Sequence, residues 1–484
     1  MDIQTNLFIN NEYLASSSGE TLTIVNPKDD SLVTDKVQVA NEQDVDKAVA
    51  AARAAFPAWR RTPSVKRSAI MLKYADLIDQ HIDKIAHLES IAMGQPIAIA
   101  KVMISVQIAT FRYYAGLTDK LPGETYPENG EGLIKLINYE PLGVCAGISA
   151  WNGTQVFVGW KIAPAVAAGN TFVFKSSEKS PLAVLYLGQL FKEAGFPPGV
   201  VNLVSGGGKT GSLLAAHMDI DKISFTGSAN SGRLVQVAAA KSNLKHVSLE
   251  LGGKSPAIIF SDADIGNAVV HNSHGFLVNS GQVCFAGSRI LVQHDVAPKF
   301  IEALRVAYLQ MSDKMDDPAL DGTVFGPLAD RAQFERVMGY LEGAKQDGIE
   351  VLTGGTRKGD HGQFVEPTIL MNPDVNNRVY TEEIFGPVVT VKTFQTEEEA
   401  IKLANNTTYG LGATIYTNDI TRAMRVQAEL QAGTVSINSA FWVAPETPFG
   451  GWKQSGYGRE GGLEGIKAFL QPKTVHINMN MPRH

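Results

Sequence analysis

A chain of 484 residues is too long for a single hydrophobic core, so we expect two or three domains. Its 44% hydrophobic and 19% charged residues are ordinary for a globular protein and argue against both a disordered chain and an integral membrane protein. The formal net charge of -6, without a basic run, argues against a nucleic acid or an anionic membrane as the main partner.

The chain contains two cysteines, Cys145 and Cys284, which are too few for the disulfide framework of a secreted protein of this length. Its first residues lack the basic and apolar regions of a signal peptide and the arginines of a mitochondrial presequence. The most apolar stretch, residues 156–169, is interrupted by Lys161 and Pro164 and is too short to cross a bilayer. We therefore expect a cytoplasmic protein.

Two segments near the start have the pattern of amphipathic helices. In residues 42–60 and 64–93, apolar side chains recur at three- and four-residue spacing. Beyond residue 138, short apolar runs alternate with helical patterns, which predicts a parallel, doubly wound sheet. The expected strands are residues 144–149, 171–175, 200–205, 222–226 and 246–251.

A second series of strands and helices follows residue 255 and predicts a second α/β domain. Its expected strands are residues 257–260, 289–293, 388–394, 413–417 and 433–438. Residues 133–138 and 474–479 alternate like strands outside both series. We expect these two segments to pair and to contact another subunit, because a terminal strand otherwise exposes unpaired backbone groups. A terminal strand that closes its own domain is the alternative.

Glycines gather where one of these strands ends. The run 206–211 satisfies the pattern G-x-G-x-x-G between a strand and a helix, as dinucleotide-binding loops do. No acidic residue follows at a strand end about 20 residues further on, so a tight turn without a phosphate is the competing interpretation. Leu203 stands where a nucleotide-hydrolysing phosphate loop requires glycine, which argues against that activity.

Two further strand ends carry groups suited to a dinucleotide. Ser228 begins a helix, where its hydroxyl and the free amides of the first turn could bind a pyrophosphate or cap the helix, and these roles are compatible. Lys175 and Glu178 follow another strand. A carboxylate at Glu178 can bind both hydroxyls of an adenine ribose and repels a 2′-phosphate, which favours NAD over NADP. A solvated surface pair of Lys175 and Glu178 is the alternative.

A cysteine and a glutamate have surroundings suited to covalent catalysis. Cys284 follows the polar break at 280–282, which fits an exposed turn at a helix start, whereas Cys145 lies in an apolar run and fits an inert buried thiol. We expect local amides or the charge of a cofactor to lower the pKa of Cys284. Glu250 stands between two leucines, as a shielded general base would, and a structural buried glutamate is the alternative.

Together these motifs resemble the aldehyde dehydrogenase family over nearly the whole chain. The segments that carry the resemblance are Ala-Trp-Asn at 150–152, residues 175–178 and 225–228, Leu-Glu-Leu-Gly-Gly-Lys at 249–254, Gly-Gln-Val-Cys at 281–284, Glu-Glu-Ile-Phe-Gly-Pro at 382–387 and Pro-Phe-Gly-Gly at 448–451. Two positions differ from the family: Ala150, where proline is common, and Gly153, where a larger side chain is frequent. These differences concern the shape of the pocket rather than the chemistry.

The resemblance implies a fold and a division into domains. We expect a Rossmann-like doubly wound cofactor domain, an α/β catalytic domain and a small β oligomerisation element. The NAD-binding domain would comprise residues 1–119 and 142–253, and the catalytic domain residues 254–453. The oligomerisation strands would comprise residues 120–141 and 467–484.

The resemblance also implies a reaction. Cys284 would attack an aldehyde, while the side-chain amide of Asn152 and the backbone amide of Cys284 stabilise the oxyanion. Hydride would pass to NAD and leave a thioester on Cys284, which water activated by Glu250 would hydrolyse. One alternative is a CoA-acylating aldehyde dehydrogenase, although such relatives usually lack the glutamate found here as Glu250. Another is a catalytically silent structural protein of the same fold.

Further residues are assigned by the same resemblance. Glu383 would hold the nicotinamide ribose with Phe385 beside the ring, and NADP is the alternative cofactor. The expected cofactor residues are Trp151, Lys175, Glu178, Gly208, Phe225, Gly227, Ser228, Gln333, Glu383 and Phe385. The expected substrate pocket contains Phe157, Trp160, Val283, Phe285, Phe441, Trp442, Val443 and Phe449.

None of these pocket residues is charged, which predicts an uncharged apolar or aromatic aldehyde as substrate, while packing of a core is the alternative role for the aromatic rings. We expect no metal site, because the ten histidines show no paired spacing with cysteines or acids. The expected partners are the aldehyde and copies of this chain in a homodimer or homotetramer, and not a nucleic acid or a membrane.

Overall fold

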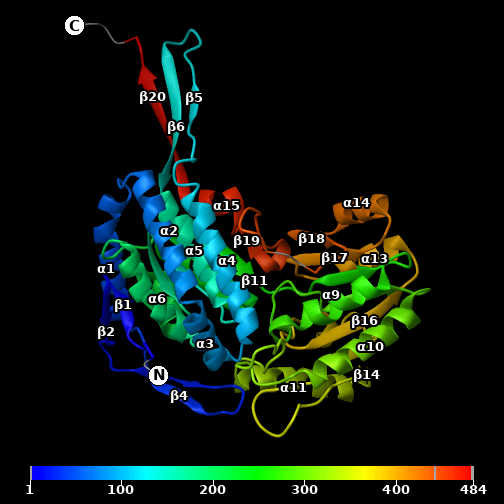
Figure 1. Ribbon diagram of the computed structural model, residues 1–484. Helices are drawn as coiled ribbons and strands as arrows, with labels where there is room; N and C mark the ends of the chain where they lie inside the picture. The colour runs from blue at the N-terminus through cyan, green and yellow to red at the C-terminus, as the bar shows by residue number, and fades with distance from the viewer. Residues whose placement is uncertain (1–2, 441–442, 481–484) are drawn as a thin grey trace.

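The computed structural model describes residues 3–440 and 443–480, which form two α/β lobes and a projecting arm (Figure 1). In the first lobe, eight strands form one sheet in the order β19-β11-β10-β7-β8-β9-β1-β2. Its parallel strands are those expected from the sequence, namely β7 (Val144–Ile148), β8 (Thr171–Lys175), β9 (Val201–Val204), β10 (Lys222–Gly227) and β11 (His246–Leu251). Antiparallel strands at the edges are β1 (Leu7–Ile9), β2 (Glu12–Leu14) and β19 (Gly456–Tyr457).

The strand order of this sheet reverses between β7 and β10. Strands β8 and β9 follow on one side of β7, and β10 and β11 lie on its other side. In doubly wound sheets, ligands bind at such a reversal, outside the carboxyl ends of the strands. Asn152 follows β7 and Ser228 follows β10, so the topology brings two of the sequence motifs to this crevice.

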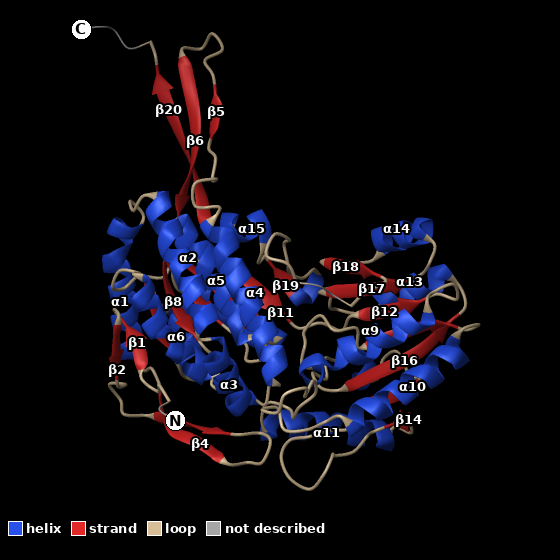
Figure 2. Cartoon of the chain, viewed as in Figure 1, coloured by secondary structure: helices blue, strands red, loops and turns tan. Residues whose placement is uncertain are grey.

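Helices cover both faces of the first sheet (Figure 2). Alternating side chains of one strand reach opposite layers: Phe172 and Phe174 pack against one set of helices, and Val173 packs against the other. The first set is α2 (Ser64–Gln80), α3 (Ile82–Met93), α4 (Ile97–Ala115), α5 (Thr154–Ala168) and α6 (Pro181–Ala194). The second set is α1 (Glu42–Trp59), α7 (Gly208–Ala216) and α8 (Ala229–Lys241). The helical pattern at 64–93 forms two helices, because the backbone leaves the helical conformation at His81 (φ -106°, ψ 13°).

The second lobe contains a seven-stranded sheet in the order β14-β15-β16-β13-β12-β17-β18. The expected strands are present as β12 (Pro256–Ile259), β13 (Arg289–Gln293), β16 (Val388–Phe394), β17 (Gly412–Tyr416) and β18 (Thr434–Ile437). The sheet also contains β14 (Glu350–Thr353) and β15 (Thr368–Met371), which the sequence patterns did not indicate. Its helices are α9 (Ile265–Leu277), η1 (Val278–Gly281), α10 (Ala297–Asp313), α11 (Arg331–Gln346), α12 (Arg378–Thr381), α13 (Glu397–Asn405) and α14 (Ile420–Glu429). The fold is therefore the mixed α/β architecture predicted from the sequence.

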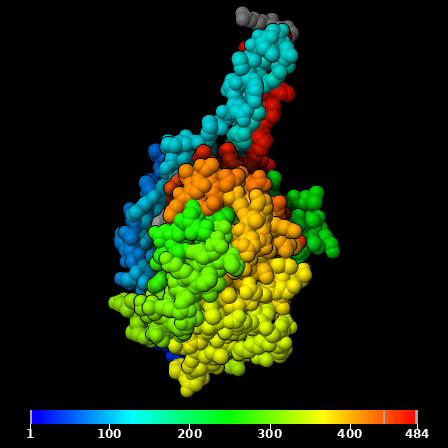
Figure 3. All heavy atoms as spheres, turned by 90° about the vertical axis from the view of Figure 1, so that its right-hand side faces the viewer, coloured from blue at the N-terminus to red at the C-terminus, as the bar shows by residue number. Residues whose placement is uncertain are grey.

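A three-stranded antiparallel arm, β20-β6-β5, stands clear of the body in two perpendicular views (Figures 1 and 3). Strand β20 (Leu470–Asn478) pairs with β6 (Leu133–Pro141) along its whole length, and β5 (Glu124–Tyr126) pairs with the other edge of β6. The two segments outside the main series thus pair with each other, as expected, while their contact with another subunit stays a prediction.

The remaining elements are a hairpin of β3 (Thr21–Val25) and β4 (Leu32–Gln38), the short helix α15 (Gly462–Lys467) and the single turn η2 (Lys453–Ser455). Among residues 3–440 and 443–480, no helix is both long and apolar enough to cross a membrane.

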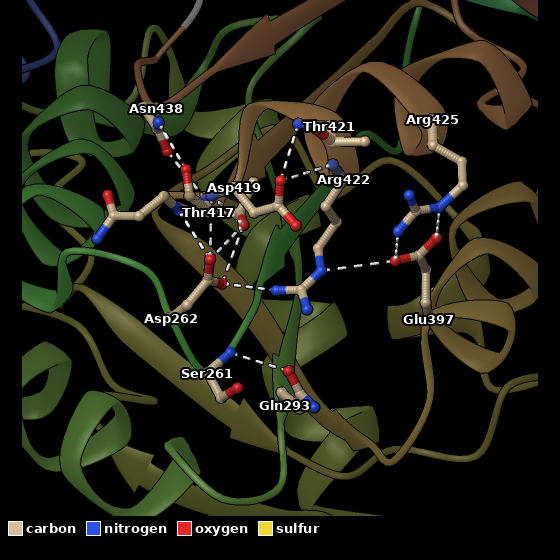
Figure 4. A network of polar contacts seen from close by, with 11 residues as sticks. Ser261, Asp262, Gln293, Glu397, Thr417, Asp419, Thr421, Arg422, Arg425 and Asn438 are labelled. Carbon is tan, nitrogen blue, oxygen red and sulfur yellow. Dashed lines mark hydrogen bonds and ion pairs between the residues drawn. The ribbon is translucent and has the colours of Figure 1, made fainter.

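A polar network fastens the loops of the second lobe (Figure 4). Asp262, in the loop after β12, accepts hydrogen bonds from Thr417 Oγ1 at 2.9 and 2.8 Å and from Arg422 Nη1 at 2.7 Å. The backbone amide of Asp419 donates to the same carboxylate at 3.1 Å. Arg422 also lies 3.5 Å from Glu397 of α13. One carboxylate therefore joins the end of β17 to α14, and Arg422 extends the network to α13.

Candidate active site

Cys284 lies in a turn that follows α9 and η1, and not at the start of a helix as the sequence suggested. The turn is entered through three consecutive residues in the left-handed conformation, Asn279 (φ 54°), Ser280 (φ 59°) and Gly281 (φ 70°). Such conformations persist in residues other than glycine only where the surroundings hold them. Here Ser280 Oγ donates to the carbonyl of Gly326 at 2.7 Å.

The pKa of Cys284 is raised well above its ordinary value, chiefly by burial and further by the neighbouring carboxylates of Glu250 and Glu383. The sequence suggested a lowering by local amides or by the charge of a cofactor. The backbone amide at Cys284 opposes the shift, but the amide is outweighed by burial and by the two carboxylates. These surroundings therefore favour the neutral thiol.

Glu250 is held at the end of β11, where its side chain is only 5% exposed. Its Oε1 has no hydrogen-bond partner among the described residues. Its pKa is raised to about 8, chiefly by burial and also by Glu460, while Lys161 opposes the rise. The glycines that follow Glu250 permit close packing here, because a Cβ on Gly253 would lie 2.4 Å from the carbonyl oxygen of Cys284. The end of β11 therefore contacts the turn that contains Cys284, which we call the cysteine turn.

Asn152 lies in the turn between β7 and α5 and is 7% exposed. One N–H of its side-chain amide donates to the carbonyl of Gln282 at 2.9 Å. A primary amide carries two N–H groups, so the second remains for another acceptor. Gln282 is itself fixed, since its Nε2 donates to the carbonyl of Asn279 at 2.9 Å and its Oε1 accepts from the amide of Ala329 at 3.0 Å.

A buried charge pair, not singled out from the sequence, acts electrostatically on Glu250. Lys161 Nζ lies 2.5 Å from Glu460 Oε1 and donates to Ser224 Oγ at 3.0 Å. Lys161 is 0% exposed. The signal in the sequence was the single lysine inside the apolar stretch 156–169, but its partner is 299 residues away. Only the fold could pair them.

Glu383 and Phe385 approach the cleft from the segment between α12 and β16. Glu383 Oε1 accepts a hydrogen bond from the amide of Gly253 at 3.1 Å, and burial raises the Glu383 pKa to about 7 against the lowering effects of this bond, Arg336 and Lys254. Phe385 has a left-handed backbone (φ 62°). Gln333 stabilises that conformation by donating from Nε2 to the carbonyl of Phe385 at 2.7 Å. The predicted cofactor residue Gln333 therefore acts on the position of Phe385.

The ring of Phe385 meets the ring of Trp151 edge to face, with centroids 5.3 Å apart. On the opposite side of the cleft, Ser228 caps α8, where its Oγ accepts from the amide of Ser231 at 3.2 Å. Phe225 packs in the core of the first lobe beside Gly227 instead of lining the cleft.

The predicted ribose pair and glycine loop lie outside the residues that line this cleft. Lys175 Nζ is 3.5 Å from Glu178 Oε2, with side chains 4% and 45% exposed. Burial lowers the pKa of Lys175. In the glycine run, Gly206 is required by the turn, because its φ is 150° and a Cβ would meet Thr210, whereas a Cβ on Gly208 would meet nothing within 4 Å.

The structure brings most of the predicted catalytic and cofactor residues into one cleft of about 250 Å³. Those that line it are Trp151, Asn152, Gly227, Ser228, Glu250, Cys284, Gln333, Glu383 and Phe385. Thr226, Arg336 and Tyr409 also line the cleft and were not singled out from the sequence. The cleft therefore combines a thiol, a shielded carboxylate and a side-chain amide beside the N-terminus of a helix.

An aromatic cluster adjoins Cys284. It contains Phe157, Trp160, Leu411 and Phe449, with Phe285 and Val443 packed against it. The rings of Trp160 and Phe449 have centroids 4.9 Å apart. Val283 lines two small cavities with Phe276 and Ala286, and Phe285 also lines one of them. Phe441 and Trp442 lie outside the described residues.

Comparison with known sequences identifies the family. The profile of the aldehyde dehydrogenase family matches residues 13–475. An aldehyde dehydrogenase of Emericella nidulans is 46% identical over 475 residues, which are 98% of this chain and 95% of the relative. Human mitochondrial aldehyde dehydrogenase is 42% identical over 478 residues, which are 98% of this chain and 92% of the relative.

Solved structures agree with the sequence comparison. Betaine aldehyde dehydrogenase from Staphylococcus aureus in complex with NAD+ has a TM-score of 0.96 at 36% identity, with 99% of this chain and 96% of that chain covered. PnpE in complex with nicotinamide adenine dinucleotide has a TM-score of 0.95 at 41% identity, with 99% of each chain covered. The chain belongs to the aldehyde dehydrogenase family and is an oxidoreductase that acts on aldehydes.

Proposed function

We propose that this protein oxidises an uncharged, apolar or aromatic aldehyde to the carboxylic acid with NAD, through a thioester on Cys284. The observation that carries the proposal is the meeting of Cys284, Glu250 and Asn152 in one cleft. The thiol and the carboxylate are close enough for each to shift the pKa of the other. This arrangement provides a nucleophile, a base and an oxyanion donor together.

The first half of the reaction forms a carbon–sulfur bond. The Cys284 thiol gives up its proton to solvent, the sulfur attacks the aldehyde carbon, and the carbonyl oxygen becomes an oxyanion. The second N–H of Asn152 and the backbone amide of Cys284 donate to that oxyanion. NAD supplies the hydride acceptor, so the carbon loses two electrons and the product on Cys284 is a thioester.

The second half requires water and a base. Glu250 takes a proton from water, which attacks the thioester carbon and releases the carboxylic acid and the Cys284 thiol. The unpaired Oε1 of Glu250 supports this role, because a buried carboxylate oxygen without a partner is available to a water molecule. Glu250 also favours hydrolysis over transfer of the acyl group to CoA.

The residues present fit the dinucleotide. The N-terminus of α8 opens into the cleft at the strand reversal, where free amides and the helix dipole favour a pyrophosphate. The buried Glu383 carboxylate would accept hydrogen bonds from the nicotinamide ribose, and Phe385 would contact the nicotinamide ring. Glu178, which is 45% exposed, can bind the adenine ribose and repels a 2′-phosphate, so NAD is favoured over NADP.

The proposed substrate class follows from the aromatic cluster beside Cys284. Its described members carry no charge that could pair with a carboxylate or phosphate of a substrate. The indole N–H of Trp160 is buried and has no partner among the described residues, so it adds a neutral donor. Comparison of kcat/KM for benzaldehyde-like, aliphatic and carboxylate-bearing aldehydes, each with NAD and NADP, tests the proposal. A preference for the charged aldehyde would contradict the substrate class, and absence of NADH formation with every aldehyde would contradict the function.

We further propose a homodimer or homotetramer in the cytoplasm, with residues 120–141 and 467–484 as oligomerisation strands. No strand among the described residues pairs with the outer edge of β20, and Ile477 and Met479 are 40% and 58% exposed on the arm. Both cysteines are free, in keeping with a reducing compartment. Light scattering during size-exclusion chromatography should give a multiple of 52.1 kDa, and the monomer mass would contradict the assembly.

A further inference from the structure

The backbone of Asn152 is held by two side-chain amides from distant parts of the chain. Asn279 Nδ2 donates to the carbonyl of Asn152 at 2.9 Å. Gln95 Nε2 lies 3.2 Å from Asn279 Oδ1 and 3.4 Å from the Asn152 carbonyl, which makes it a donor to both. Gln95 is 2% exposed and Asn279 is 1% exposed. Because water is excluded, these contacts fix the peptide group that carries Asn152.

Gln95 reaches this position from the junction of α3 and α4. Helix α3 ends at Gly94 in the left-handed conformation (φ 73°). A Cβ on Gly94 would lie 2.5 Å from Pro327 Cγ, so the absence of a side chain lets the segment 326–329 pack directly on the junction. That segment also accepts the Ser280 hydroxyl and donates to Gln282. The junction is thereby packed against the cysteine turn.

Asn279 is the first left-handed residue of that turn. Asparagine tolerates this conformation better than most residues, and glycine tolerates it without strain. The side chain of Asn279 is therefore not required for the backbone shape alone. Its observed contacts run to Asn152, Gln95 and, at 3.5 Å, the carbonyl of Gln282.

Both ends of Asn152 are consequently constrained. Asn279 and Gln95 contact its main-chain carbonyl, and Gln282 accepts one N–H of its side chain. Because both the main-chain carbonyl and one side-chain N–H of Asn152 are held, the direction of its second side-chain N–H is restricted. We propose that Gln95 and Asn279 are positioning residues that aim the Asn152 amide at the oxyanion, an inference that rests on the proposed role of Asn152.

The test uses variants that remove the donors with little change in shape. Gln95→Leu replaces the amide with an apolar group, and Gln95→Glu keeps the shape but places an acceptor against two oxygen atoms. Asn279→Gly removes the amide and retains the left-handed backbone. The matched control is Asn372→Gly, at another left-handed asparagine (φ 45°) outside the cleft.

The measured quantity is the single-turnover rate of NADH formation at saturating aldehyde and NAD. We expect Gln95→Leu and Asn279→Gly each to lower it by about 10- to 100-fold, because a small misplacement of a catalytic group has effects of that size. KM for NAD should change less than about twofold, and Asn372→Gly should match the wild type. Gln95→Glu serves as the second variant should Gln95→Leu fold poorly, and we expect it to be at least as slow.

The decisive comparison repeats Gln95→Leu and Asn279→Gly in the Asn152→Ala background. A positioning role through Asn152 predicts less than about a twofold further loss, because the group being aimed is already absent. Equal fold-losses in both backgrounds, or wild-type rates for the single variants, would overturn the inference. A different result, full activity of Asn152→Ala alone, would instead refute the oxyanion role in the proposed function and remove the basis of this inference with it.

Discussion

Asp262 lies in the loop after β12 of the second lobe, and Glu250 lies near the end of β11 in the cleft. Both residues are carboxylates, but their surroundings differ. Asp262 accepts hydrogen bonds from Thr417, Arg422 and two backbone amides (Figure 4). Glu250 is 5% exposed, and its Oε1 has no hydrogen-bond partner in residues 3–440 and 443–480. Within the same residues, Thr226 Oγ1 and Lys254 Nζ are likewise buried without hydrogen-bond partners.

This difference fits a structural role for Asp262 and the proposed chemical role of Glu250. The hydrogen bonds to Asp262 hold loops together, so they contribute to the stability of the folded protein. Buried polar atoms without partners cost stability, and they are therefore expected where a water, substrate or cofactor completes the set. Changes in the cleft should therefore alter rates, and changes in the Asp262 network should alter stability.

Among changes in the cleft, we expect Cys284→Ala to have the largest effect on the reaction rate. Removal of the nucleophile should lower aldehyde-dependent NADH formation by about 10,000-fold or more, measured at 340 nm. The matched control is Cys145→Ala, at a fully buried thiol in the first lobe, which should retain turnover. Turnover of Cys284→Ala within tenfold of the wild type would contradict a covalent mechanism.

The next largest effect is expected for Glu250→Gln. Loss of the base should lower steady-state turnover by about 100- to 10,000-fold while a first burst of NADH remains, because hydride transfer precedes hydrolysis. Rapid-mixing absorbance measurements separate the two phases. Glu89→Gln provides a control at another buried glutamate, which accepts a hydrogen bond from Gln155 at 2.7 Å and lies outside the cleft. Unchanged steady turnover in Glu250→Gln would remove this residue from the mechanism.

A smaller effect concerns pH. Glu250 acts as a base only when ionised, and its pKa is raised to about 8, so hydrolysis-limited turnover should rise with pH up to about that value. The raised pKa of Cys284 acts in the same direction, because the thiolate is favoured as pH increases. Well below the Glu250 pKa, kcat should fall about tenfold per pH unit. A kcat that is constant between about pH 6 and 8 would contradict the assignment.

The smallest effect on activity is expected for Asp262→Ala. Several hydrogen bonds to a charged acceptor are lost, so the free energy of unfolding should fall by about 2 kcal/mol in denaturant titrations. The kcat of the remaining folded enzyme should equal that of the wild type. A large loss of kcat without a loss of stability would show that this network acts on the cleft, and would contradict its purely structural role.

Most of the strands of the first sheet and most of the cleft residues could be predicted from the sequence, because local patterns and short motifs indicate strands, turns and reactive residues. Five parallel strands of the first sheet and the cleft residues Cys284 and Glu250 were identified in this way, whereas Asn152 was assigned through the family resemblance. The Lys161–Glu460 pair was not, since its members are 299 residues apart and only the fold makes them neighbours.

The groups that raise the Cys284 pKa could not be predicted from the sequence, for a related reason. The sequence suggested a lowering by local amides or by the charge of a cofactor; the amide at Cys284 does lower this pKa, but burial and two carboxylates from other segments raise it. Strands β14 and β15 were missed because each has only four residues, which are too few to show a clear period; β14 is half-buried or exposed, and β15 is mostly buried. The Asp262 network was also beyond local patterns, because its members come from separate segments between 262 and 425.

The most direct test of the covalent mechanism is mass spectrometry of the Glu250→Gln variant, quenched during its first NADH burst with aldehyde and NAD. The covalent mechanism predicts an added mass equal to the acyl group on the peptide that contains Cys284, at a stoichiometry matching the NADH burst. Formation of burst NADH with an unmodified Cys284 peptide would contradict the account.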